Sequence, residues 1–97
     1  MKSKYTVLIE KNALKQLKRI DKFQRRMIYG YIKKNLENTS DPKIQGKPLR
    51  GKLKNYWRYR VGDYRIIAEI DEDTVKIIII KIGHRKDIYR KDIYRKG

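Results

Sequence analysis

The sequence predicts an α+β fold in which two N-terminal helices pack on one face of a mainly antiparallel, four-stranded twisted sheet. Its 97 residues are enough for one modest hydrophobic core. Apolar residues recur at three- and four-residue steps in the first third of the chain, whereas the second half alternates apolar and polar residues in short segments. We therefore expect residues 1–97 to form a single domain.

The first third predicts a strand and two helices. Residues 4–10 alternate as in a short strand, and apolar residues at helical spacing follow over residues 13–20. A second, longer helix is expected to begin at Asp21, which forms a capping-box pattern with Gln24 three residues later, and to end near Asn38.

The second half predicts three strands. Residues 39–48, with both prolines of the chain, form the one long loop that we expect. Residues 56–61 and 64–70 flank Gly62-Asp63, a two-residue turn with glycine first, as in a type II′ hairpin. Residues 75–82 are too uniformly apolar for a half-exposed strand, so they predict an interior one.

The expected hairpin register places two arginines side by side. With Gly62-Asp63 as the loop, Arg60 faces Arg65 and Arg58 faces Ile67. Like charges directly opposite in a sheet are unfavourable, so we expect an anionic ligand there. A simpler interpretation stays open, since alternating arginines are also typical of a solvated outer face.

The next hairpin is expected to bring further basic residues to the same end of the sheet. If Glu69 meets Lys76, the last strand runs back toward the Gly62 turn and carries His84 and Arg85 with it. The arginines can then line one concave patch, with Tyr89 close behind. Taken by itself, the duplicated ending KDIYRKDIYRKG is equally typical of a solvated tail.

Composition narrows the possible functions. Lysine and arginine number 27 against 11 acidic residues, a formal net charge of +16, which favours a nucleic acid or an acidic protein as partner. The absence of cysteine excludes disulfides, thiol catalysis and thiolate zinc sites. No apolar run approaches the ~20 residues of a membrane span, and the N-terminal apolar stretch is too short for a signal peptide, so we expect a cytoplasmic protein. The sequence has no basic helix with a broad apolar face, so we expect no membrane partner. The lone His84 has no companions at ligand spacing, so we expect neither a metal nor a cofactor.

The segment KPLRGKLKNYWRYRVGDYRIIAEID, followed by IIIIKIGHRKDIYR, resembles the RelE branch of the RelE/ParE toxin superfamily. The opening LIEKNALKQLKRID resembles the strand-to-helix start of the same family. The resemblance implies a toxin of a type II toxin–antitoxin system that enters the decoding site of the ribosome and cuts mRNA. It also implies an acidic, RelB-like antitoxin as partner, in a complex that can be a heterotetramer.

The resemblance also implies site residues. By position, the basic pair of the family falls on Arg58 and Arg60, the arginine after the hairpin on Arg65, the arginine after the last strand on Arg85, and the C-terminal tyrosine on Tyr89.

Three further residues are secondary candidates. The second KDIYR copy makes Tyr94 a rival of Tyr89, and Lys52 and Lys54 are candidates for contact with ribosomal RNA.

These residue types suit RNA cleavage in which the adjacent 2′-OH is the nucleophile. We expect Arg65 to stabilise the charge of the transition state, because a guanidinium matches phosphate oxygens bidentately and keeps its charge. Nearby guanidinium groups favour the phenolate of Tyr89, which can then act as a base or stack on a nucleobase. Arg85 is assigned to the phosphate or leaving oxygen, and His84 is a secondary acid or base.

Two other functions remain open from the sequence. A ParE-like toxin would share the fold and act on DNA gyrase. A basic RNA-binding module without catalytic activity would use the same charge.

Overall fold

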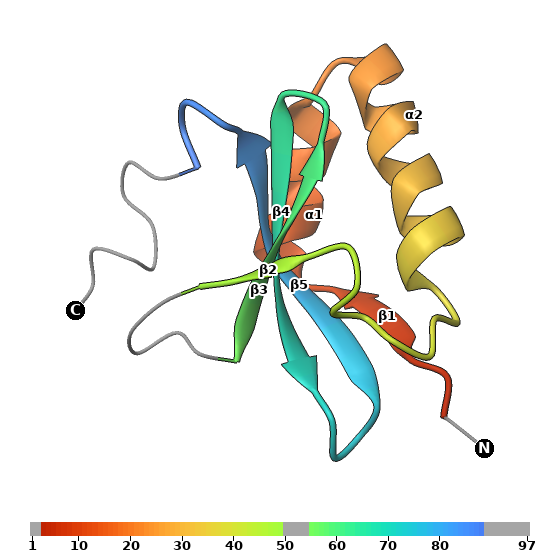
Figure 1. Cartoon of the computed structure of the whole chain (residues 1–97). Coiled ribbons are helices and arrows are strands. Elements are labelled where there is room, and N and C mark those ends of the chain that lie inside the picture. Colours follow the sequence, from red (N-terminus) through yellow and green to blue (C-terminus); the bar gives the residue numbers. More distant parts are fainter. Residues whose placement is uncertain (1–2, 50–54, 89–97) are drawn as a thin grey trace.

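A five-stranded sheet with helices on one face forms the frame of the molecule (Figure 1). The computed structural model describes residues 3–49 and 55–88. The strands are β1 (Thr6–Ile9), β2 (Lys47–Pro48), β3 (Tyr56–Val61), β4 (Tyr64–Asp71) and β5 (Lys76–His84), in the spatial order β1-β5-β4-β3-β2. The α+β class is as predicted, but the count of four strands is wrong. A two-residue strand, β2, forms inside the predicted loop and pairs with β3.

The last strand of the chain is an interior strand, as its uniformly apolar sequence predicts. β5 pairs with β4 in antiparallel fashion and with β1 in parallel, so it has neighbours on both sides over its first half. In Figure 1 it runs up the middle of the sheet and ends beside the tip of the β3–β4 hairpin. The residues that follow β5 therefore begin beside the tip of the β3–β4 hairpin.

The helical part consists of α1 (Lys11–Arg19), α2 (Lys22–Tyr31) and a wider turn of π-helix, η1 (Ile32–Leu36). Asp21 is the N-cap residue of α2, but its side chain makes no capping hydrogen bond. The predicted position of the N-cap is therefore confirmed, whereas the predicted capping hydrogen bond of the Asp21 side chain is wrong. Asn38, with a left-handed φ of 65°, lies just beyond η1, so the predicted end of this helical segment is close to the observed one.

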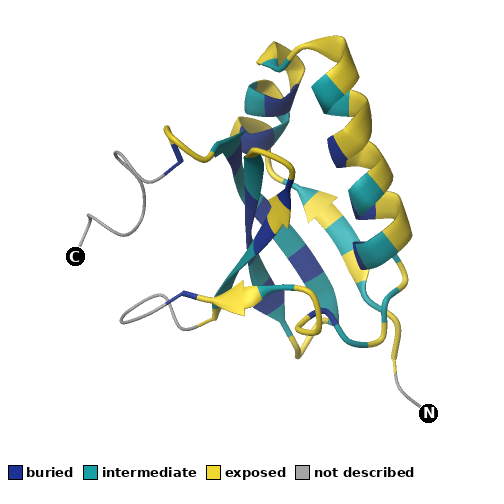
Figure 2. Ribbon diagram, turned by 45° about the horizontal axis from the view of Figure 1, so that its top comes forward, coloured by how far each residue is buried: buried dark blue, intermediate teal, exposed yellow. Residues whose placement is uncertain are grey.

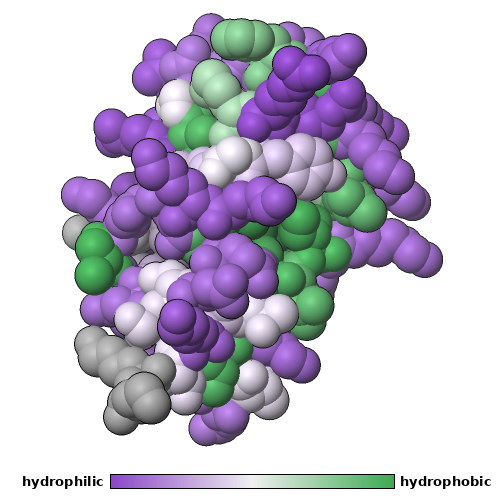
Figure 3. Space-filling model, turned by 90° about the vertical axis from the view of Figure 1, so that its right-hand side faces the viewer, coloured by the Kyte–Doolittle hydropathy of each residue, from purple (hydrophilic) through white to green (hydrophobic). Residues whose placement is uncertain are grey.

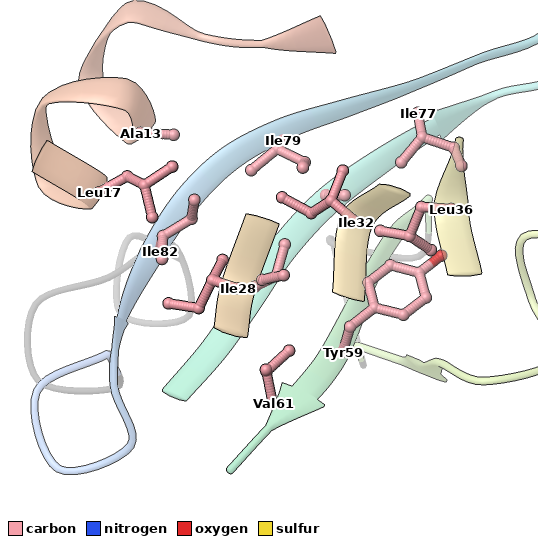
Figure 4. Close-up of a cluster of buried hydrophobic side chains, with 12 residues drawn as sticks. Ala13, Leu17, Ile28, Ile32, Leu36, Tyr59, Val61, Ile77, Ile79 and Ile82 are labelled. Carbon is pink, nitrogen blue, oxygen red and sulfur yellow. The ribbon is translucent and has the colours of Figure 1, made fainter. Parts of the chain in front are cut away.

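The main core lies between the helices and the sheet (Figure 2). Alternate residues of β3, β4 and β5 point toward the helices and meet the apolar stripe of α1, α2 and η1, as the close-up in Figure 4 shows. Tyr59 is 0% exposed, and its hydroxyl donates a hydrogen bond to the carbonyl oxygen of Pro42. Its ring also leaves no room at Gly46, where an added Cβ would lie 2.8 Å from Tyr59 Cε1.

The register of the β3–β4 hairpin is the predicted one. Arg60 pairs with Arg65, Val61 with Tyr64, and Arg58 with Ile67. Gly62 has a φ of 59°, and the next residue does not have a positive φ, which fits a turn with its left-handed residue first.

The register of the β4–β5 hairpin differs from the predicted one. Glu69 pairs with Ile78, and Lys76 pairs with Asp71 instead. The Asp71 carboxylate accepts hydrogen bonds from the N–H groups of Asp73 and Thr74, and the loop spans residues 72–75 instead of the expected 71–74. A bulge between Ile67 and Ala68 shifts the pairing again.

A second, smaller apolar cluster lies on the face of the sheet away from the helices. It consists of Leu49, Ile67 and Ile88, with Tyr56 and Ile80 packed against it. Ile88 follows β5 by four residues and is 1% exposed. It therefore fixes the start of the C-terminal segment on this outer face.

Candidate active site

Two opposed arginines mark the outer face of the β3–β4 hairpin. Arg60 and Arg65 are directly paired across the strands. Because successive side chains of a strand point to opposite faces, both arginines lie on the face away from the helices. Arg60 is exposed and Arg65 is half-buried. The predicted pairing of like charges is thus present, on a face that no described helix covers (Figure 1).

The guanidinium of Arg65 is held by the turn of its own hairpin. Its Nη1 donates to the carbonyl oxygens of Gly62 at 3.1 Å and of Tyr64 at 3.0 Å. Two bonds to rigid backbone acceptors fix the plane of the group, because a guanidinium is planar and presents its donors in a set geometry. The other N–H groups of Arg65 are then oriented before any ligand arrives.

A second layer of cations lies two pairs further from the hairpin tip, on the same face. Arg58 pairs with Ile67, and Ile67 pairs with Lys81 on its other side. Lys47 of β2 pairs with Arg58. The structure thus adds Lys81 and Lys47 to the predicted set; both were missed because they depend on the β4–β5 register and on a strand of two residues.

Arg85 connects the end of β5 to the hairpin tip. Its N–H donates to the carbonyl oxygen of Asp63 at 2.8 Å, and its Nε lies 3.8 Å from Asp63 Oδ1, an exposed ion pair. The predicted convergence of Arg85 with the hairpin is present at the level of the backbone. Its side chain, however, is directed toward a carboxylate at the tip.

His84 lies on the other side of the sheet from Arg65. It pairs with Tyr64, whose ring packs on the helix-side core, and the two rings meet edge to face with centroids 5.4 Å apart. Its Nδ1 accepts a hydrogen bond from the N–H of Lys86 at 3.1 Å. The structure therefore does not bring His84 together with the arginine pair.

Ile88 lies over Gly83 on the outer face of the sheet. Its Cδ1 would lie 3.2 Å from a Cβ added to Gly83, and Gly83 is the β5 partner of Arg65. Since Gly83 has no side chain, Ile88 can lie over the strand at this point. Tyr89 follows Ile88 directly in the sequence.

Four of the predicted site residues lie outside the described part of the chain. They are Lys52, Lys54, Tyr89 and Tyr94. The remaining predicted residues divide into Arg58, Arg60 and Arg65 on the outer face, Arg85 at the hairpin tip, and His84 on the helix side.

The outer face is suited to binding a phosphate group. We use the term arginine face for the surface formed by Arg58, Arg60, Arg65 and Lys81.

Within residues 3–49 and 55–88, no group of three or more histidine or acidic side chains could hold a metal ion. No helix in the same ranges is long and apolar enough to cross a membrane.

Comparisons with known proteins agree on the family. The sequence model described as the ParE toxin of the type II toxin–antitoxin system, parDE, matches residues 7–89. Toxin RelE3 of Methanocaldococcus jannaschii is 39% identical over 85 residues, which are 86% of this chain and 93% of that protein.

Solved structures show the same fold. The toxin–antitoxin complex RelBE2 of Mycobacterium tuberculosis superposes with a TM-score of 0.76 at 27% identity, covering 88% of this chain and 95% of that one. The RelB–RelE complex of Methanococcus jannaschii gives a TM-score of 0.61 at 35% identity, covering 87% and 96%.

The fold and the extent of these matches define the class: the chain belongs to the ParE toxin family of type II toxin–antitoxin systems. Within the RelE/ParE superfamily its relatives place it in the RelE branch.

Proposed function

We propose that this protein is a type II toxin that cuts mRNA in the decoding site of the ribosome. The observation that carries the proposal is the Arg60–Arg65 pair, because two like charges are held opposite each other on an open sheet face. A phosphate bound between them would remove the repulsion and would meet donors already oriented by the hairpin.

In the proposed reaction the 2′-OH of the substrate attacks the neighbouring phosphorus. The bond to the leaving 5′-oxygen breaks, and that oxygen takes up a proton. Arg65 stabilises the negative charge of the transition state, with Arg60 and Arg58 beside it. Tyr89 removes the 2′-OH proton or orients a base, and Arg85 contacts the phosphate or the leaving oxygen.

The position of His84 supports dependence on the ribosome. Since it packs against Tyr64 on the helix side, the arginine face has no histidine among the residues that the structure describes. When a site has positive charge but no ordinary acid–base pair, its reaction rate gains most from a partner that holds the RNA in line for attack. The ribosome supplies that orientation in our proposal, and the many lysines and arginines serve to dock on ribosomal RNA.

We further propose an acidic antitoxin as the protein partner. The similar solved structures include RelE toxins in complex with RelB antitoxins. On the α2 side of this protein, apolar areas lie among hydrophilic side chains (Figure 3). Phe23 is 68% exposed and Met27 39% exposed, next to basic residues of α2. An acidic amphipathic segment would match both the charge and the apolar areas.

One experiment tests the proposed function. The purified protein is incubated with translating ribosomes, and the 5′ ends of the mRNA are mapped. We expect new ends at codons in the decoding site, and far fewer when the same mRNA is supplied without ribosomes. Unchanged mRNA would contradict the proposal.

The same preparation separates the second candidate. Because the matching sequence model is that of the ParE toxin, a parallel assay adds the protein to DNA gyrase and supercoiled DNA. Cleaved DNA with intact mRNA would indicate a gyrase poison. Binding to RNA without cleavage of either substrate would indicate a non-catalytic RNA-binding module.

A further inference from the structure

The second half of β5 has an edge without a partner strand in the described part of the chain. β1 pairs only with residues 76–79 of β5, so residues 80–84 extend beyond it. Helix α1 lies beside this edge, and Gln16 Oε1 accepts a hydrogen bond from the N–H of Ile82 at 2.9 Å. The side chain of Gln16 thus takes the place of a neighbouring strand at one point.

A pocket of about 380 Å³ opens beside this edge. We call it the edge pocket; it is lined by Gln16 and Arg19 of α1, by residues 81–84, and by residues 87–88. Its size lies near the lower end of the roughly 300–1,000 Å³ that small-ligand sites span, which suits one small ligand.

The walls of the edge pocket combine positive charge with apolar surface. Arg19 and Lys81 are the basic residues of the lining besides His84, whereas Asp87 is the one acidic residue. Ile82 and Ile88 are 2% and 1% exposed and offer almost no surface, so the apolar part comes from the half-buried Gly83 and the ring of His84. Cations next to an apolar wall suit a ligand that has both a phosphate and a flat ring.

Arg19 is the residue best placed to bind an anion. It lies in the last turn of α1, where its side chain is exposed. Within the part of the chain that the structure describes, its guanidinium makes no hydrogen bond or ion pair. No bond within these residues therefore has to break before it accepts a phosphate.

The edge pocket adjoins the arginine face. Gly83 lines the pocket and is also the strand partner of Arg65. Lys81 lines the pocket as well and is one of the residues that define the arginine face. Strands in a sheet lie about 4.8 Å apart, so an RNA strand held at Arg65 can reach the pocket with its next nucleotide.

We propose that the edge pocket binds one nucleotide of the RNA, next to the phosphate held on the arginine face. Arg19 contacts the phosphate of this nucleotide, and its base lies against Gly83 and the ring of His84. The role of this RNA as the substrate that is cut rests on the proposed function. Arg19 acts in binding and takes no part in the reaction itself.

The direct test measures binding without ribosomes. The four nucleoside 5′-monophosphates, the free nucleosides and inorganic phosphate are titrated separately into the isotope-labelled protein, and backbone amide shifts are followed by NMR. We expect saturable shifts at Gln16, Arg19 and Gly83 with at least one monophosphate. Arg19→Ala should weaken this binding about tenfold, the factor that corresponds to about 1.4 kcal/mol.

Lys15→Ala is the matched control, because it removes one exposed positive charge from the same helix and lies outside the pocket. We expect it to leave the affinity within about twofold of the unchanged protein. Equal weakening by both variants would overturn the proposal. So would shifts confined to residues 58–65, or an affinity for inorganic phosphate as high as that for every monophosphate.

A second readout separates this proposal from the proposed function. With translating ribosomes, Arg19→Ala should raise the toxin concentration that gives half-maximal cleavage, and the rate at saturation should stay within about twofold. A loss at saturation as large as that of Arg65→Ala would contradict a binding role. If the unchanged protein cuts no mRNA at all, the proposed function fails, and the NMR titration still decides the nucleotide site.

Discussion

Arg65 has fewer orientations open to it than an ordinary surface arginine. Two backbone carbonyl oxygens of its own hairpin accept from its Nη1, and Arg60 stands directly opposite. A donor that is oriented before the substrate arrives needs no reorganisation in the transition state. The electrostatic role that we propose for Arg65 follows from this geometry.

Arg65→Ala should therefore reduce cleavage at saturating toxin by ~10²-fold or more, the range for loss of one preorganised donor. The carbonyl oxygens of Gly62 and Tyr64 remain close to solvent, so the fold should be kept. Arg65→Lys should lose nearly as much, because an ammonium group has no fork of donors. Single-turnover cleavage on programmed ribosomes measures the effect.

Arg26→Ala is the control for charge, since Arg26 is an exposed arginine of α2. We expect it to change docking at most and to leave the saturated rate within about twofold. Cleavage by Arg65→Ala at the rate of the unchanged protein would end the assignment.

The tyrosine of the first KDIYR copy is expected to be the functional one. Ile88 is buried on the outer face over Gly83, and Tyr89 is the next residue, whereas Tyr94 is five residues further along. Tyr89→Phe should lower cleavage strongly, and removal of residues 91–97 should leave measurable cleavage. Both proteins are compared on the same ribosomes. A greater loss with Tyr94→Phe would show that the second copy supplies the group.

Tyr59 provides a prediction about pH. Burial, with smaller contributions from Tyr31 and Asp41, raises the pKa of Tyr59 above its ordinary value of about 10. Because the folded state holds this proton more tightly than the unfolded state, the stabilisation is complete below pH ~10 and is lost as pH rises through the folded pKa.

Tyr59→Phe should lower the free energy of unfolding by about 1 kcal/mol at pH 7, since the buried carbonyl of Pro42 loses its donor. The gap between the two proteins should narrow as pH rises above ~10. Urea unfolding from pH 7 to 11 measures it, with Tyr29→Phe as a control at the surface. A gap that is constant over this range would contradict the assignment.

At the scale of elements, the join between β5 and the C-terminal segment depends on Gly83. An alanine there would place its Cβ 3.2 Å from Ile88 Cδ1, so Ile88 would have to move. We expect Gly83→Ala to lower the free energy of unfolding by about 1 kcal/mol. Cleavage should fall about tenfold, because displacement of a catalytic group by ~1 Å can cost up to ~10²-fold.

Gly30→Ala is the matched control for Gly83→Ala. Gly30 lies inside α2 with nothing within 4 Å of an added Cβ. The change should raise the free energy of unfolding by about 0.5–1 kcal/mol and leave cleavage as it is. Thermal unfolding and the ribosome assay check both variants. Normal cleavage by Gly83→Ala, with its stability lowered, would show that the position of Ile88 does not matter for activity.

The elements differ in how far the sequence predicts them. The β3–β4 register follows from a two-residue loop with a required glycine, so Arg60 and Arg65 could be placed opposite each other in advance. The β4–β5 register depends on the carboxylate of Asp71 and on a bulge at Ile67, neither of which has a strong signal in the sequence. Lys81 could not be assigned to the arginine face for that reason.

Short and irregular elements were missed for other reasons. β2 has two residues, one of them Pro48, and it forms only because β3 offers a partner. The wider turn η1 has the same apolar spacing as the end of an α-helix, so periodicity does not distinguish the two. Asp21 has the position of a capping residue, but a sequence pattern does not show which hydrogen bond its side chain makes.

At the scale of the whole molecule, the net charge of +16 should govern association. Attraction to an acidic antitoxin speeds the encounter, and salt screens exposed charges beyond ~8–10 Å. We expect the association rate constant with the product of the neighbouring gene to fall as salt rises from ~50 to ~500 mM. Stopped-flow mixing at several salt concentrations measures it. A rate constant that ignores salt would exclude steering by charge.

The position of β5 has a consequence for the timing of synthesis. Of the described strands, this interior strand is the last to be made, and β1, one of the first segments, needs it as its parallel partner. At ~5–20 residues per second, the nascent chain exists for roughly 4–17 s before its central strand is complete. During that interval the β3–β4 hairpin has no neighbour on its β5 side, and Ile88 is not yet present. In the proposed function, the groups that act on RNA are therefore not assembled before β5 has been made, which gives an antitoxin time to meet the chain first.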